Sequence, residues 1–170
     1  MEQTNQPIDL VNNPESTPVE YAGFLMRLLA YFIDAIILSF ALGIFWVILM
    51  AVLGVGTDAF ADFDDPENFA AEMMAGSLIF AASIGSVVVV WLYYALMESG
   101  KNQATLGKMV LNLKVTDMNG GPISFGRATG RYFGKIISGA ILYIGYIMIA
   151  FTDKQQGLHD MIANCLVVKK

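Results

Sequence analysis

Two residues of opposite charge, Arg27 and Asp34, lie in the apolar stretch FLMRLLAYFIDAIILSF at residues 24–40. On a helix they share nearly the same face and stand about 10.5 Å apart along the axis, too far for an easy salt bridge. A carboxylate at membrane depth costs roughly 2.5–3.5 kcal/mol unless it is protonated or faces protein or water. Asp34 is therefore expected to have a structural or functional partner, and a proton or cation is one candidate.

The surroundings of Arg27 indicate a different role. Its long aliphatic stem allows the guanidinium to extend toward cytoplasmic lipid headgroups, which is the favoured interpretation for this residue. Tyr31 lies between Arg27 and Asp34 on the same stripe and is a candidate hydrogen-bond partner of either.

The segment ATLGK at residues 104–108 superficially resembles a phosphate-binding loop. It has no glycine five positions before Gly107, and Met109 stands where Ser or Thr would hold a metal ion. We instead expect Gly107 to permit a tight bend that leaves Lys108 at the membrane surface.

The remaining polar residues indicate no metal centre and no enzyme. His159, the one histidine, is adjacent to Asp160 rather than at the spacing that a helical metal site needs, so a capping or packing role is expected. The single cysteine, Cys165, excludes an internal disulfide and a cysteine-built metal site. Since no nucleophile with its base is visible, we predict no catalytic residue, no cofactor and no enzymatic activity.

The composition is that of an integral membrane protein. Hydrophobic residues make up 56% of the 170 residues and charged residues 15%, with a mean hydropathy of +0.57. A soluble domain has roughly 25% charged residues. The few basic residues lie beside apolar segments, which argues against a nucleic-acid partner and makes the lipid bilayer the expected one.

Two uncharged segments, 35–55 and 77–97, are long enough to be transmembrane helices. Residues 57–76 between them carry six acidic residues and no basic one, and Asp65-Pro66-Glu67 is typical of a helix start. Residues 98–135 carry six basic residues against two acidic ones. Because basic residues accumulate in short cytoplasmic loops, the N-terminus is predicted to lie inside, and the location is a cytoplasmic (inner) membrane crossed more than once.

The third apolar segment, 136–151, is marginal in length. It either spans the membrane or forms a re-entrant hairpin broken near Ser138-Gly139, and the second choice keeps the C-terminus inside. Alternating apolar residues at 111–116, turn residues at 119–122 and the tail NCLVVKK predict a small cytoplasmic β-hairpin. The fold class expected is an all-α helical membrane protein with this small sheet.

Small residues repeat at every fourth position on both predicted spans. These ladders predict that the two helices approach closely, and they allow a homo-oligomer. Their members are Ala35, Ser39 and Gly43 on the first span, and Ser77, Ala81 and Gly85 on the second.

The first 22 residues differ in character from the rest. They are polar and acidic, contain three prolines and have no basic residue, so they do not form a secretory signal. We expect residues 1–22 to be a disordered cytoplasmic tail and residues 23–170 to be the membrane domain.

Three ordered motifs resemble the RDD family of small bacterial and archaeal membrane proteins, named for one arginine and two aspartates. They are FLMRLLAYFIDAIIL, ATLGKMVLNLKVTDMNGGPISFGRATGR and KQQGLHDMIANCLVV. The resemblance implies that Arg27 is the family arginine and that Asp34 and Asp160 are the two aspartates. What it implies about function is modest: transport of unknown ligands, with sodium/proton exchange for some members.

Combined with the topology, the resemblance gives a working hypothesis. Arg27 holds Asp160 at the cytoplasmic ends of the spans, and Asp34 faces a cavity as a proton or cation ligand, supported by Tyr31, His159 and Lys108. One function is a small cation/proton transporter, which at this size is expected to need oligomerisation. The alternative is a non-transporting scaffold or accessory subunit whose charged residues hold the fold together.

Overall fold

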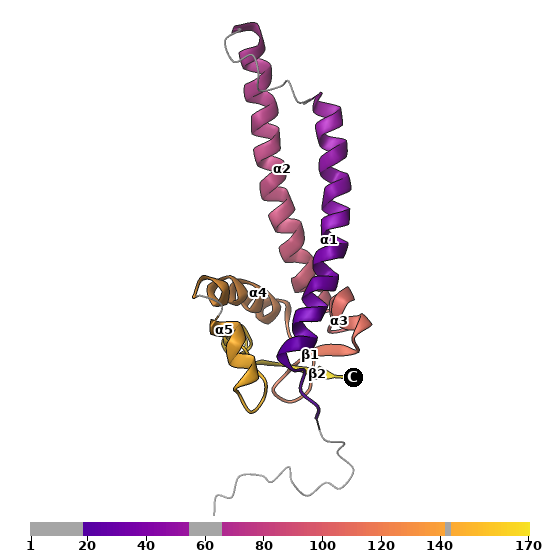
Figure 1. Ribbon diagram of the computed structural model, residues 1–170, viewed down its shortest axis with the longest axis vertical. Coiled ribbons are helices and arrows are strands. Elements are labelled where there is room, and N and C mark those ends of the chain that lie inside the picture. Colours follow the sequence, from indigo (N-terminus) through magenta and orange to yellow (C-terminus); the bar gives the residue numbers. More distant parts are fainter. Residues whose placement is uncertain (1–18, 55–65, 142–143) are drawn as a thin grey trace, which may run out of the picture.

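Two long helices dominate the computed structural model, which describes residues 19–54, 66–141 and 144–170. Helix α1 (Phe24–Leu53) and helix α2 (Pro66–Ser99) run in opposite directions and extend away from a smaller base (Figure 1). Their 30 and 34 residues correspond to about 45 and 51 Å, more than the roughly 30 Å of a bilayer core. Within the described residues, these two are the helices long and apolar enough to cross a membrane.

Helix α2 begins at Pro66, as the sequence Asp65-Pro66-Glu67 predicts, and it continues past the predicted span to Ser99. Proline suits the first helical position because its missing N–H would have no intrahelical partner there. Residues 55–65, which hold four of the six acidic residues of segment 57–76, lie outside the described residues.

The base contains short elements around a two-stranded antiparallel sheet. In chain order they are α3 (Leu106–Val110), β1 (Leu113–Asp117), α4 (Phe125–Ala140), α5 (Ile144–Ile147), η2 (Met148–Ala150), α6 (Leu158–Ile162) and β2 (Cys165–Lys169). Val115 pairs with Val167 at the centre of the sheet, and both are fully buried. The predicted sheet is confirmed, whereas its cytoplasmic location stays a prediction.

The connection between the two strands differs from the predicted hairpin. After β1, the Asp117 side chain accepts hydrogen bonds from the N–H groups of Asn119 and Gly121, which turns the chain toward α4 rather than into a second strand. The partner strand arrives only after α4 to α6. The turn residues were identified correctly, and the predicted pairing of the strand near residues 111–116 with the C-terminal tail is confirmed, although the long connection makes it a two-stranded sheet rather than a hairpin.

The described chain begins at Val19 and is tied at once to the sheet. Tyr21 bridges Val168, the Ala22 N–H donates to Val167 O at 2.9 Å, and the Lys169 N–H donates to Glu20 O at 2.9 Å. Residues 1–18, most of the predicted tail, lie outside the described residues.

The third apolar segment is divided among several elements rather than forming one continuous helix. Helix α4 ends at Ala140, and α5 and η2 follow. Figure 1 shows α4 lying crosswise to α1 and α2. Its buried residues recur at helical spacing as Ala128, Arg131, Gly134 and Ser138, so α4 is an amphipathic helix packed on the base.

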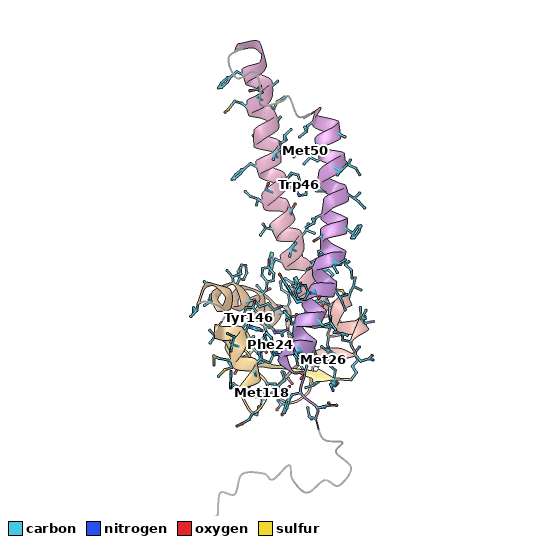
Figure 2. The ribbon with its side chains drawn as sticks, viewed as in Figure 1. Phe24, Met26, Trp46, Met50, Met118 and Tyr146 are labelled. Carbon is cyan, nitrogen blue, oxygen red and sulfur yellow. The ribbon has the colours of Figure 1, made fainter. Side chains whose placement is uncertain are left out.

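The predicted close approach of the small-residue ladders is not found. A Cβ atom built at Gly43 or Gly85 meets none of the described atoms within 4 Å. The helices are nearest at the base and separate away from it (Figure 1), while Trp46 and Met50 lie on the separated part of α1 (Figure 2). Apolar helices gain little from each other in lipid, so the polar contacts at the base decide how this pair is held.

Candidate functional site

Asp34 is buried where α1, α2 and α3 meet. Its Oδ1 accepts hydrogen bonds from the Tyr93 hydroxyl and the Gly107 N–H, both at 2.7 Å, and its Oδ2 accepts one from Thr105 Oγ1 at 2.6 Å. The residue is 1% exposed. The expected partner of Asp34 therefore exists, and it is a set of three neutral donors.

The position of α3 depends on Gly107. A Cβ atom at this residue would lie 2.1 Å from the carbonyl oxygen of Ala30, so only glycine lets the start of α3 approach α1 so closely. Tyr93 completes the arrangement, because its hydroxyl accepts the Leu106 N–H at 3.0 Å while donating to Asp34. Asp34 thus joins three helices at one point.

Arg27 binds the base of the molecule. It donates to the Asp160 carboxylate, to Gln155 O at 2.5 Å and to Ala22 O at 2.7 Å. Its side chain is 8% exposed, so the interpretation that it extends into lipid headgroups is wrong: carbonyl and carboxylate acceptors of the base take up its donors. The expected contact between Arg27 and Asp160 is present.

A second arginine, Arg131, extends this contact into a network. Its Nε donates to Asp160 Oδ1 at 2.7 Å, and a terminal nitrogen donates to Glu98 Oε2 at 2.8 Å. Glu98 in turn accepts from Lys108 Nζ at 2.5 Å. Lys135 Nζ lies 3.6 Å from the same Glu98 oxygen, Oε1. These six residues, Arg27, Asp160, Arg131, Glu98, Lys108 and Lys135, are called the charge network below.

Burial and charge act against each other in this network. Burial alone would raise the pKa of Asp160, but the charges of Arg131 and Arg27 outweigh it and hold the pKa well below its usual range. Burial lowers the pKa of Lys108 to about 7, and the nearby charge of Arg131 acts in the same direction, while Glu98 opposes them. Lys108 is buried and paired with Glu98 rather than exposed, and its place at the level of the membrane surface stays a prediction.

His159 packs in the base next to Asp160. Its ring centroid lies 5.1 Å from that of Tyr146, and its Nε2 lies 3.5 Å from Asp160 Oδ1. Burial lowers the pKa of His159 to about 3; Asp160 opposes this shift, and the charges of Arg131, Lys135 and Arg27 add to it. The packing role expected for this histidine is confirmed. Tyr31, by contrast, is 58% exposed, and neither Arg27 nor Asp34 bonds to it among the described contacts.

The low pKa of His159 predicts a loss of stability in mild acid. Since the unfolded chain has a histidine pKa near 6.5, it binds more protons than the folded chain between about pH 6.5 and 3, and the free energy of unfolding falls as the pH falls. We expect thermal unfolding between pH 7 and 5 to show this decline, and His159→Gln to flatten it. Parallel curves for the two proteins would contradict the assignment, because no other histidine is present.

A cavity of about 430 Å³ lies beside Asp34 and the charge network. Arg27, Lys108, Arg131 and Lys135 line it together with Asp34. Its remaining wall is mostly apolar and includes Phe24 and Tyr146, both of which lie in the base (Figure 2). No group of three or more His, Cys, Asp or Glu residues placed to hold a metal ion occurs in the part of the chain that the structure describes.

Several residues of the site were not singled out from the sequence. They are Tyr93, Glu98, Thr105, Arg131 and Lys135. One usable signal was Glu98, a lone acid at the end of the second apolar segment. Another was Arg131, which lies at the same helical spacing as the small residues that α4 buries.

The fold and the site define a small, mostly helical protein with two helices that could span a membrane. The chain belongs to the RDD family, whose pattern matches residues 21–164. It is 44% identical over 149 residues to the uncharacterized protein YxaI of Bacillus subtilis (strain 168), covering 88% of this chain and 97% of that protein.

The alignments with two further relatives cover a smaller share of the relative. The uncharacterized membrane protein YteJ of Bacillus subtilis (strain 168) is 32% identical over 156 residues, covering 87% of this chain and 80% of that protein. The proline-rich antigen homolog of Mycobacterium tuberculosis (strain ATCC 25618 / H37Rv) is 29% identical over 153 residues, covering 87% of this chain and 63% of that protein. No solved structure matches the chain.

Proposed function

We propose that this RDD protein is a non-transporting membrane scaffold or accessory subunit, in which the arginine and the two aspartates hold the base against two transmembrane helices. The observation that carries the proposal is that all three residues already have protein partners. Asp34 accepts three donors, and Arg27 and Asp160 bind each other. Three of the roughly four acceptor sites of the Asp34 carboxylate are taken by neutral donors, which leaves little capacity to bind a cation.

The proposal includes the location of the protein and its orientation in the membrane. The bilayer of a cytoplasmic (inner) membrane is its first partner, with the N-terminus and the base inside, because basic residues concentrate in the segment that builds the base. It carries out no catalysis and binds no nucleic acid. The exposed apolar faces of α1 and α2 are available to lipid or to another copy of the chain.

Cation/proton exchange centred on Asp34 is the second candidate, favoured by one observation. Asp34 lines the cavity and is close to the start of the predicted span. Against it stand the four cationic side chains that line the same cavity, because their field raises the cost of admitting another cation.

Asp34→Asn separates the two candidates. An amide keeps the shape, but the hydrogen bonds from Tyr93 and Gly107 are no longer charge-assisted and the Thr105 hydroxyl loses its acceptor, so we expect a loss of about 2 kcal/mol of unfolding free energy. Thermal unfolding in detergent measures this loss, with Asp153→Asn as a control that removes an exposed carboxylate. A variant as stable as the wild type that loses an ion flux would favour the exchange candidate instead.

A further inference from the structure

The wall of the cavity carries a surplus of positive charge. Arg27, Lys108, Arg131 and Lys135 line it, and Asp34 is the acid among its lining residues in the described chain. Both oxygens of Asp34 already accept hydrogen bonds from neutral groups. The acids that pair with the four cations, Glu98 and Asp160, are not part of the described lining. The cavity is therefore suited to an anion.

The two lysines have donors that no described acceptor uses. Lys135 Nζ is 3.6 Å from Glu98, beyond hydrogen-bond distance, and lies 4.6 Å from the centre of the Tyr94 ring. Lys108 makes one hydrogen bond, to Glu98, although an ammonium group carries three donors. Burial lowers the pKa of both lysines despite Glu98. An anion in the cavity would supply the missing acceptors and charge.

The approach to the cavity is apolar. Leu28, Tyr31 and Ile147 line it and are 37%, 58% and 49% exposed. Residues 35–53 of α1 alone reach about 29 Å, nearly the thickness of the hydrocarbon core, which leaves the preceding turns at the inner boundary of the membrane. In helix α4, Phe133 and Ile136, which are close in sequence to the cavity-lining Lys135, are also exposed. An anion that enters here is expected to carry an apolar tail.

We propose that this cavity binds the phosphate headgroup of an anionic phospholipid. The headgroup lies against Lys135, Lys108 and Arg131, and an acyl chain leaves past Tyr31 and Ile147. Basic pockets on the cytoplasmic side of transmembrane helices bind anionic headgroups in this way, and the volume of about 430 Å³ is in the range of ligand sites. The inference rests on the membrane topology of the proposed function and is independent of ion exchange.

The experiment measures binding of phosphatidylglycerol to the full-length protein purified in a neutral detergent. We expect phosphatidylglycerol to raise the Tm by about 5 °C and native mass spectrometry to show one bound lipid per chain. Phosphatidylcholine, whose headgroup carries a compensating positive charge, should do neither. Inorganic phosphate is the third arm, and an equal shift with phosphate would overturn the lipid assignment in favour of a soluble anion.

Variants assign the binding to the cavity. Lys135→Gln should weaken phosphatidylglycerol binding about tenfold, whereas Lys101→Gln, which removes an exposed lysine outside the cavity, should leave binding unchanged. Should Lys135→Gln fail to fold, Tyr31→Glu places a repelling charge at the exposed mouth, with Phe32→Glu as its control on the neighbouring exposed position. Unaltered binding in Lys135→Gln or in Tyr31→Glu would overturn the proposal, as would no bound lipid in the wild type.

Discussion

Replacing Asp160 with asparagine is expected to destabilise the protein by about 3–5 kcal/mol, the largest effect of any single change considered. The Asp160 carboxylate is fully buried and holds two guanidinium groups, those of Arg27 and Arg131. An amide leaves Arg27 without its acidic partner and leaves Arg131 with Glu98 alone. Urea or thermal unfolding of the purified protein measures the loss.

Comparing the stability losses of several variants tests this explanation more sharply than the loss of Asp160→Asn alone. Arg27→Met should lower the free energy of unfolding by less than Asp160→Asn. In this variant Asp160 still accepts the hydrogen bond from Arg131 Nε at 2.7 Å, and the methionine side chain replaces the packing of the aliphatic part of Arg27. Asp153→Asn, which removes an exposed carboxylate of the same loop region, should change stability by less than about 0.5 kcal/mol. Equal losses in Asp160→Asn and Asp153→Asn would show that the charge network does not hold the base.

Gly107→Ala is expected to cost about 3 kcal/mol or more, although it adds one methyl group. The new Cβ would lie 2.1 Å from Ala30 O, so α3 must move away from α1. That movement also lengthens the hydrogen bond from the Gly107 N–H to Asp34, now 2.7 Å, and leaves a buried carboxylate partly unsatisfied. The measured quantity is the free energy of unfolding.

Gly130→Ala is the matched control for this change. Gly130 lies inside α4, and a Cβ atom there meets none of the described atoms within 4 Å. Alanine at an open helical position is expected to stabilise by about 0.5–1 kcal/mol, because glycine loses more backbone freedom on folding. A Gly107→Ala protein as stable as Gly130→Ala would contradict the close approach of α3 to α1.

The elements with a strong local signal could be predicted from the sequence. The two apolar helices, the start of α2 at Pro66 and the strand-forming segments of β1 and β2 all follow from composition, proline placement and alternation. The pairing of β1 with β2 was also expected, because both strands were predicted on the same side of the membrane. The intervening α4 to α6 were not foreseen, since α4 joins residues 125–135, which were counted as a basic loop, to the start of the apolar segment 136–151.

The site was predictable in part. The contact of Arg27 with Asp160 followed from topology and the family resemblance, and Asp34 was correctly expected to have a partner. The partners of Asp34 come from segments about 60 to 70 positions away, so no local sequence pattern predicts them. They are Tyr93, Thr105 and the Gly107 N–H. Arg131 was counted only toward the charge of its loop, because a charged residue near a membrane is first read as solvated.

Ion exchange by the purified protein in liposomes tests most directly the central claim that the arginine and aspartates hold the fold together rather than carry ions. A pH-sensitive dye reports whether added sodium or potassium dissipates an imposed proton gradient across about pH 6 to 9. The account predicts no dissipation beyond that of protein-free liposomes, with insertion verified. Cation-dependent dissipation by the wild type, lost in an Asp34→Asn variant of unchanged stability, would contradict it.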